Sequence, residues 1–282
     1  MGSQVLITGC SSGFGLEAAV ACARRGFRVF ASMRNLDKRS ALDEAVASAG
    51  VTERVEVVRL DVTDGASIRQ AVAGILDGGG GLYGVVHNAG INVAGAFEDL
   101  PDDEIRRVLE TNFFGVLALT REVLPQMRER RKGRIVCVSS NSAFGGTPGL
   151  SAYAASKWAL EGWAESIAFE LEPFGIDVVL FEPGVYRTEI WDSSERHKPQ
   201  DSAYAGFLEV GESFLNRLVL PHARHPREVG EAIASALDAK RPRFRNPMGP
   251  DAWITAAAQR ALPYRVRMRA TGLVSGLRHW KP

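Results

Sequence analysis

The sequence predicts an α/β protein with a single doubly wound parallel sheet and helices on both of its faces. Short apolar segments alternate with longer helical patterns along most of the chain, and strands separated by helices pair in parallel through right-handed crossovers. Several segments, 85–86 and 135–138 among them, are apolar at consecutive residues, as expected of strands covered on both faces. A glycine-rich turn stands between the first strand and the first helix, which predicts a sheet of the Rossmann type.

The individual elements follow from local patterns. The apolar segment 5–7 predicts a strand, and the alanine-rich helical pattern 16–23 stops at Gly26. Further strands are predicted at 28–32, 55–60, 82–87, 134–139 and 177–182, and further helices at 36–49, 66–76, 102–130, 153–171 and 229–238. We expect one catalytic domain, 1–240, with a substrate lid at about 186–227, and a basic extension, 241–282, packed on the same domain.

Composition excludes several classes of function. The 282 residues are 45% hydrophobic, enough for a substantial core, and the formal net charge of +1 is too balanced for a nucleic-acid surface. Cys10, Cys22 and Cys137 form no CxxC pair and are too few for a disulfide framework, which indicates a reducing compartment. A strand begins by about Val5, leaving no room for a signal peptide, and no apolar run approaches the ~18 residues of a spanning helix. We expect a cytoplasmic protein without stable membrane insertion.

The histidines give no support for a metal site. His222 and His225 are close in sequence, but they stand beside Pro221 and Pro226 in a predicted loop without further ligands nearby. A zinc site in a protein needs three or four ligands held together. We therefore expect no bound metal.

The glycine-rich turn is Thr8-Gly9-Cys10-Ser11-Ser12-Gly13-Phe14-Gly15. Glycines at such a corner let the backbone turn tightly and let a pyrophosphate approach the helix N-terminus, where free N–H groups favour an anion. A turn that closes the corner without a ligand is one alternative. Another is the nucleophile elbow of α/β hydrolases, because residues 9–13 fit G-x-S-x-G. That elbow needs an oxyanion-hole loop from an earlier strand, and this turn follows the first strand, so the hydrolase is a minor alternative.

Further motifs follow the predicted strands or lie in helices: Asp61-Val62, His87-Asn88-Ala89-Gly90, Asn112, Ser140, Tyr153 with Lys157, and Pro183-Gly184-Val185-Tyr186-Arg187-Thr188. In this order, and with the glycine turn, they resemble the short-chain dehydrogenase/reductase family along nearly the whole chain. Residues 8–15 and 153–162 are most similar to its 17β-hydroxysteroid and retinol dehydrogenase branch. His87 departs from the family, which usually has asparagine at this position.

The resemblance implies a role for each motif. It implies that Asp61 contacts the adenine and that Lys157 binds the nicotinamide ribose. Asn112 is implied to hold a water near this lysine in a proton relay, the alternative being a helix-packing amide. The remaining cofactor-binding residues that it implies are Thr8, Gly9, Ser11, Gly13, Phe14, Gly15, Val62, Asn88, Ala89, Gly90, Tyr153, Pro183, Gly184, Val185 and Thr188.

Tyr153 and Lys157 are four residues apart in a helical stretch, so both project from one face about one turn apart. A tyrosine with an ordinary pKa of about 10 is a poor base near neutrality, and a nearby ammonium lowers that pKa. Ser140 ends a buried strand, where the active groups of an open α/β sheet gather. The resemblance places the catalytic serine thirteen residues before the tyrosine, which selects Ser140 over Ser139 and Ser142.

The choice of cofactor depends on the residue about twenty positions beyond the glycines, which is acidic in NAD-binding folds. Counting from Gly13 leads to Met33, followed by Arg34. A guanidinium suits the 2′-phosphate of NADP, and no carboxylate is present to repel it. NADP(H) is therefore preferred over NAD(H), the alternative being that Arg34 only caps a loop and both cofactors are used.

These residues predict an NADP(H)-dependent oxidoreductase that reduces a ketone or aldehyde, or oxidises the alcohol, with Tyr153 as acid or base. Apolar residues of the lid favour a hydrophobic substrate such as a steroid, retinoid or polyketide-like ketone: Tyr186, Ile190, Trp191, Tyr204, Phe207, Leu208, Phe214 and Leu215. A catalytically silent NADP-binding sensor or scaffold is the alternative. We expect a homo-oligomer, dimer or tetramer.

The extension carries nine lysines and arginines against one acid, Asp251. Apolar residues recur in it at helical spacing, which predicts a short amphipathic helix before Pro263: Trp253, Ile254, Ala257, Ala261 and Leu262. Such a helix either lies on an anionic membrane or folds back as a cap over the pocket or a subunit contact. We favour the cap, because an alanine-rich stripe buries little area for membrane binding.

Overall fold

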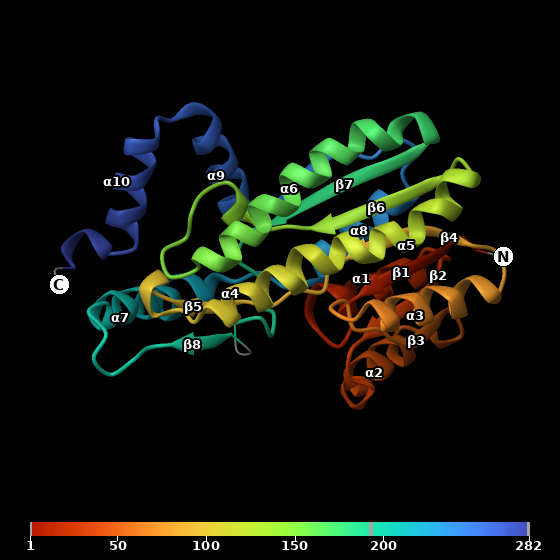
Figure 1. The fold of residues 1–282 in the computed structure, drawn as a ribbon, viewed down its shortest axis with the longest axis horizontal. Coiled ribbons are helices and arrows are strands. Elements are labelled where there is room, and N and C mark those ends of the chain that lie inside the picture. The colour runs from red at the N-terminus through yellow and green to blue at the C-terminus, as the bar shows by residue number, and fades with distance from the viewer. Residues whose placement is uncertain (1, 192–193, 281–282) are drawn as a thin grey trace.

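The computed structural model describes residues 2–191 and 194–280. Its central sheet has seven parallel strands in the order β3-β2-β1-β4-β6-β7-β9 (Figure 1). The strands are β1 (Gln4–Thr8), β2 (Arg28–Met33), β3 (Val55–Arg59), β4 (Leu82–His87), β6 (Gly133–Val138), β7 (Ile176–Pro183) and β9 (Arg245–Met248). Strand order reverses between β1 and β4, so the doubly wound α/β prediction is confirmed.

Helices cover both faces of this sheet, and two apolar clusters fill the space beneath them. On one face pack α1 (Gly13–Arg24), α2 (Ser40–Ser48) and α8 (Arg227–Asp238). On the other pack α3 (Gly65–Asp77), α5 (Gly115–Glu129) and α6 (Ser151–Leu171). Gly230 of α8 lies so close to α1 that a Cβ there would stand 2.6 Å from the carbonyl carbon of Glu17.

The helix predicted at 102–130 is divided by a π-helical turn. It consists of α4 (Asp102–Leu109), the π-turn Glu110–Phe114 and α5. Single π-helical turns inside α-helices are frequent at functional sites, and this one contains the buried Asn112. After it, Gly115 packs tightly on the segment that follows β3, since a Cβ would lie 2.7 Å from the Val62 carbonyl oxygen.

The chain beyond β7 builds the lid and the C-terminal end. A small second sheet pairs β5 (Val93–Gly95) with β8 (Glu195–His197), and α7 (Ala205–Phe214) follows. The strand β9, which sequence patterning did not reveal, lies in the segment we had assigned to the extension and completes the central sheet beside β7. The extension therefore begins within the sheet and continues as α9 (Pro250–Ala261) and α10 (Tyr264–Val274).

The helix expected before Pro263 is present as α9, but our prediction of which of its faces is buried is wrong. Trp253, Ile254 and Leu262 are 56%, 68% and 44% exposed, whereas Ala252 and Ala256 face the protein. The small side chains of Ala252 and Ala256 let α9 approach the neighbouring turn closely. The predicted apolar stripe is exposed instead and does not cover the pocket. Among the described residues, no helix is both long and apolar enough to cross a membrane.

Candidate active site

A cleft of about 570 Å³ opens at the carboxyl ends of the central strands. Most of the predicted site residues line it: Gly9, Ser11, Gly13, Phe14, Arg34, Asp61, Val62, Asn88, Ala89, Gly90, Ser140, Tyr153, Lys157, Pro183, Gly184, Val185 and Thr188. Thr8, Gly15 and Asn112 lie behind this surface rather than on it. This is the position where open α/β sheets bind their ligands.

The glycine turn leaves room for an anion at the start of α1. Gly9 and Gly13 have φ angles of +72° and +56°, which favour glycine. A Cβ on Gly15 would lie 2.2 Å from the Gly9 carbonyl oxygen, so only glycine lets the helix approach the turn. No side chain caps the helix at Ser12, and its N-terminal N–H groups remain available for phosphate oxygens. The turn fits a dinucleotide pyrophosphate.

Thr8 and Asn88 fix the shape of this turn from behind. The Thr8 hydroxyl donates to the Val86 carbonyl (3.2 Å) and accepts from the backbone N–H groups of Asn88 and Ala89, both at 3.0 Å. The Asn88 amide donates to the carbonyls of Thr8 (2.8 Å) and Gly9 (3.1 Å). These bonds tie the end of β1 to the end of β4.

Asn112 also forms hydrogen bonds with backbone groups in this structure. Its Oδ1 accepts from the Ile91 N–H (2.8 Å), and its Nδ2 donates to the Ile91 carbonyl (2.9 Å) and to the Ser156 hydroxyl (3.0 Å). Ser156 precedes Lys157 on α6, so Asn112 joins the loop after β4 to the helix that carries Tyr153. The predicted relay through Asn112 remains a prediction.

Ser140, Tyr153 and Lys157 form the polar centre of the cleft. The Ser140 hydroxyl hydrogen-bonds the Tyr153 phenol, which lowers the pKa of Tyr153, but burial outweighs this bond and raises it. Burial also lowers the pKa of Lys157 to about 8. Lys157 Nζ donates to the Val138 carbonyl (2.9 Å) and lies 5.5 Å from the Tyr153 ring centroid. The expected lowering of the tyrosine pKa by Lys157 is thus not seen here, because the ammonium is directed to that carbonyl.

Two cations stand at the far end of the cleft. Met33 ends β2 and is buried, and the exposed Arg34 and Lys38 both line the cleft. Lys38 was missed by sequence reasoning; it ends the short 3₁₀ helix Leu36–Lys38, which Asn35 caps just after Arg34. The Asp61 carboxylate accepts from the Thr63 N–H (3.0 Å) and hydroxyl (2.7 Å), which fixes the turn after β3.

Asp251 of α9 is a further residue that the sequence did not reveal. Its Oδ2 accepts from the Val185 N–H (2.8 Å) and from Asn141 Nδ2 (3.4 Å). A Cβ on Gly184 would lie 2.0 Å from the same oxygen, so the carboxylate accounts for glycine at this position. Asp251 therefore holds the loop after β7 beside the loop that carries Ser140.

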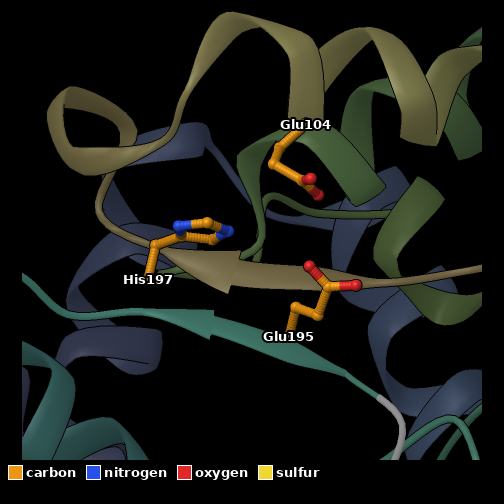
Figure 2. Close-up of side chains that lie close together, drawn as sticks. All are labelled: Glu104, Glu195 and His197. Carbon is orange, nitrogen blue, oxygen red and sulfur yellow. The ribbon is translucent and has the colours of Figure 1, made fainter.

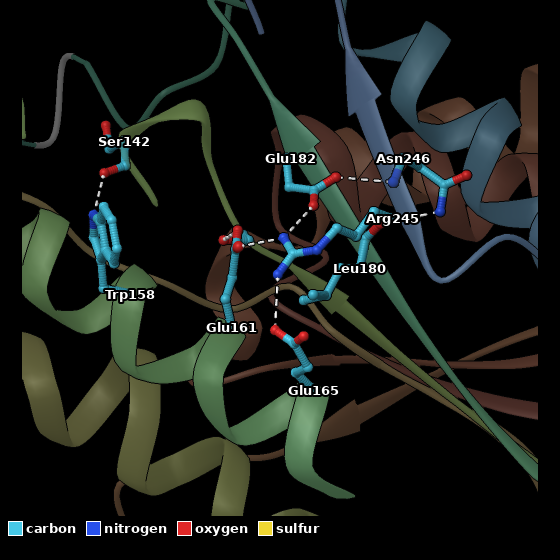
Figure 3. Close-up of polar contacts among 9 residues, drawn as sticks. Ser142, Trp158, Glu161, Glu165, Leu180, Glu182, Arg245 and Asn246 are labelled. Atoms are coloured by element: carbon cyan, nitrogen blue, oxygen red, sulfur yellow. Dashed lines mark hydrogen bonds and ion pairs between the residues drawn. The ribbon is translucent and has the colours of Figure 1, made fainter. Parts of the chain in front are cut away.

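A charge network, in which Glu161 and Glu182 are buried, supports these loops from beneath (Figure 3). Arg245 of β9 pairs with Glu161 (2.6 Å), Glu182 (3.0 Å) and Glu165 (3.3 Å). Glu161 also accepts from the Ser139 hydroxyl (2.7 Å). Burial, and secondarily the Glu161 charge, raises the pKa of Glu182 to about 7 despite Arg245.

The predicted lid divides into two parts. Tyr186, Ile190 and Trp191 line the cleft. Tyr204 and Phe207 instead contact Trp280, with ring centroids 6.3 Å and 5.6 Å away, so they belong to the junction between α7 and the C-terminus. His87 lies outside the cleft, where Thr120 Oγ1 is 2.9 Å from its ring nitrogen and burial lowers its pKa to about 3. It is a neutral packing residue.

One group of potential metal ligands lies beside the lid (Figure 2). Ligand atoms of Glu104, Glu195 and His197 come within 4.8 Å of one another. Arg107 pairs with Glu104 and, at 3.0 Å, with Glu195. A guanidinium thus already neutralises both carboxylates, and the cluster fastens β8 to α4.

The fold and cleft define a Rossmann-type dinucleotide-binding protein, and comparison with known proteins identifies its family. The family model for short chain dehydrogenases matches residues 3–199. The chain is 36% identical over 252 residues to bovine retinol dehydrogenase 8, covering 86% of this chain and 80% of that one. It is 34% identical to the 3-ketodihydrosphingosine reductase of Bacteroides thetaiotaomicron, covering 87% of each.

A solved short-chain dehydrogenase from Streptomyces avermitilis superposes with a TM-score of 0.81 at 33% identity, covering 100% of this chain and 99% of that one. The chain belongs to the short-chain dehydrogenase family and is an oxidoreductase. This membership confirms the resemblance found in the sequence, including its nearness to the retinol dehydrogenases. It gives no support to the hydrolase or to the silent sensor.

Proposed function

We propose that this protein is an NADP(H)-dependent reductase of a ketone or aldehyde on a hydrophobic small molecule. The observation that carries the proposal is the hydrogen-bonded Ser140–Tyr153 pair, with Lys157 beside it, in the same cleft as the glycine turn. Bound reduced nicotinamide would supply the hydride to the carbonyl carbon. The Ser140 hydroxyl orients the carbonyl oxygen, and the Tyr153 phenol gives that oxygen its proton.

The protonation states of Tyr153 and Lys157 favour carbonyl reduction over alcohol oxidation near neutral pH. Because burial raises the pKa of Tyr153, the phenol keeps its proton until the substrate oxygen becomes basic. Once Lys157 Nζ leaves the Val138 carbonyl and turns to the Tyr153 oxygen, its ammonium stabilises the phenolate that remains. In the oxidative direction the same groups work in reverse, and this needs a higher pH to populate the phenolate.

Arg34 and Lys38 support the preference for NADP(H). Both line the end of the cleft beyond Met33, and neither forms an ion pair with a described residue. A ribose 2′-phosphate would supply the missing anion. The neighbouring pair Arg39–Asp43 (2.7 Å) shows that a third cation in this stretch is already neutralised.

The substrate class rests on the lining and on relatives. Tyr186, Ile190 and Trp191 give the cleft an apolar side, and two relatives are named for retinol and for 3-ketodihydrosphingosine, both lipids. We propose a lipophilic carbonyl compound as the substrate, with retinoids, long-chain ketones and steroids as the first panel.

Two experiments test the proposal. NADPH oxidation with the carbonyl panel should show turnover that Tyr153→Phe abolishes while calorimetry still detects NADPH binding. Met33→Asp with Arg34→Ala and Lys38→Ala should reverse the preference between NADPH and NADH. Equal affinities of the wild type for both cofactors would refute the NADP assignment, and cofactor binding without turnover of any compound would favour the silent sensor.

A further inference from the structure

Residues 250–280, here termed the arm, carry a surface that is both apolar and basic. The arm extends beyond the sheet at one end of the molecule, where α9 and α10 project from the body (Figure 1). The helix α10 buries none of its 11 residues. Large apolar side chains are exposed along the arm: Trp253, Ile254, Leu262, Tyr264, Val266, Met268, Leu273 and Val274.

One side of α10 carries a row of apolar side chains. Val266, Ala270, Leu273 and Val274 are spaced as on one side of a helix, and Val266, Leu273 and Val274 are 47%, 51% and 66% exposed. Arg267 donates to the Phe144 carbonyl of the body (3.4 Å). Val266 and Leu273 lie about 100° and about 120° around the helix from Arg267, whereas Val274 lies about 20° from it. Val266 and Leu273 therefore lie to the side of this contact with the body, and both remain exposed. A helix this short is marginal in water, so an uncovered apolar face points to a partner.

The positive charge of the arm indicates which kind of partner binds it. Arg260, Arg265, Arg269 and Arg278 are exposed and form no ion pair with described residues. A second copy of the chain docked face to face would bring two sets of unpaired arginines together. An anionic phospholipid surface instead offers phosphates to the arginines and acyl chains to the apolar set. We propose that the arm binds the surface of an anionic membrane, with α10 lying along it.

The geometry limits how the membrane is engaged. The 11 residues of α10 are too short to cross a bilayer, which needs about 20, so the binding is peripheral. Trp280 packs on Tyr204 and Phe207, which joins the arm to the lid helix α7. Membrane binding would thus bring the lid to the lipid surface. The proposal does not depend on the assignment of cofactor or substrate.

The test is co-sedimentation of the full-length protein with vesicles of phosphatidylcholine alone or with phosphatidylglycerol added. We expect binding only to the anionic vesicles, weakened by salt. Arg265→Glu with Arg269→Glu should lower the partition coefficient by at least about tenfold, since each cation near the surface contributes substantially. Val266→Ser with Leu273→Ser should lower it as well, and this loss should persist at high salt.

A matched control separates the arm from overall charge. Arg24→Glu with Arg128→Glu makes the same change in net charge on exposed helix ends of the body, and it should change partitioning by no more than about twofold, because surface charges farther than a Debye length act weakly. Absence of wild-type binding, or an equal loss in this control, would overturn the proposal. So would self-association in sedimentation velocity that Val266→Ser with Leu273→Ser abolishes while vesicle binding is absent. Circular dichroism confirms that each variant is folded.

Discussion

Replacement of Arg245 by methionine should destabilise the fold in a pH-dependent way. Methionine keeps the length of the side chain but removes the charge that faces Glu161 and Glu182, whose side chains are 8% and 0% exposed. Removing one partner from a buried ion pair costs about 3–5 kcal/mol. We expect a loss of this size above pH 8, where the wild type has the Glu182 carboxylate ionised beside Arg245.

The sign of the pH dependence follows from Glu182. Its pKa in the folded protein, about 7, exceeds its ordinary value of 4.5. Its contribution to stability is therefore fully present below pH 4.5 and is lost as the pH rises through about 7. Arg245 limits this rise in pKa, so without it the pKa of Glu182 rises further. The deficit of the variant should then grow by up to about 1.4 kcal/mol per pH unit above neutrality.

Urea unfolding at pH 5.5 and pH 8.5, followed by circular dichroism, measures this difference. Arg28→Met is the matched control, because Arg28 pairs with Glu56 at 3.0 Å on the surface, with side chains 45% and 53% exposed. It should cost at most about 1 kcal/mol, equally at both pH values. A loss for Arg245→Met that is the same at both pH values, or no larger than that of the control, would show that Arg245 does not stabilise the ionised Glu182 carboxylate.

Three further predictions concern the cleft. Asp251→Leu leaves the Val185 N–H without its acceptor and should weaken NADPH binding by about tenfold or more in calorimetry, whereas Asp251→Asn, which keeps an oxygen, should restore most of it; equal losses would contradict this. Gly15→Ala should abolish NADPH binding without unfolding the protein, because its Cβ would meet the Gly9 carbonyl; wild-type affinity would argue against the turn as the phosphate site. The kcat/KM for carbonyl reduction should fall above pH 8 as Lys157 loses its proton. A kcat/KM that stays constant up to pH 10 would exclude a role for the Lys157 ammonium in the reaction.

Sequence patterns predicted those parts of the fold that local chemistry determines. The strand β1 and helix α1 with their glycine turn follow from residues adjacent in the chain, and so does the pairing of Tyr153 with Lys157 on one helix face. Consecutive apolar residues marked β4 and β6 as strands covered on both sides. Each of these signals lies within about ten residues, where spacing and burial determine each other.

The features of the structure that sequence patterns did not predict depend on residues far apart in the chain. Arg245–Met248 has neither an apolar run nor alternation, yet it pairs with β7 as a strand. Residues distant in the chain hold it there: the Glu182 carboxylate accepts from the Asn246 N–H (2.8 Å), and Asn246 Nδ2 donates to the Leu180 carbonyl (3.0 Å). The direction of Lys157 depends on a carbonyl 19 positions earlier in the chain. A window of about ten residues does not contain both members of such a pair.

The C-terminal segment therefore has two roles that a truncation cannot separate. Arg245 holds Glu161 and Glu182 beneath the loops of the cleft, and Asp251 holds Val185 within them. Removing the chain from Arg241 onward would leave buried carboxylates unpaired and an active-site loop unsupported, so loss of activity would reveal nothing about the arm. Asp251 of α9 holds a loop of the site, whereas Val266 and Leu273 of α10 are exposed and are not among the described residues that line the cleft. Substitutions of these exposed residues alone, such as Val266→Ser with Leu273→Ser, can test the membrane role while the cleft stays intact.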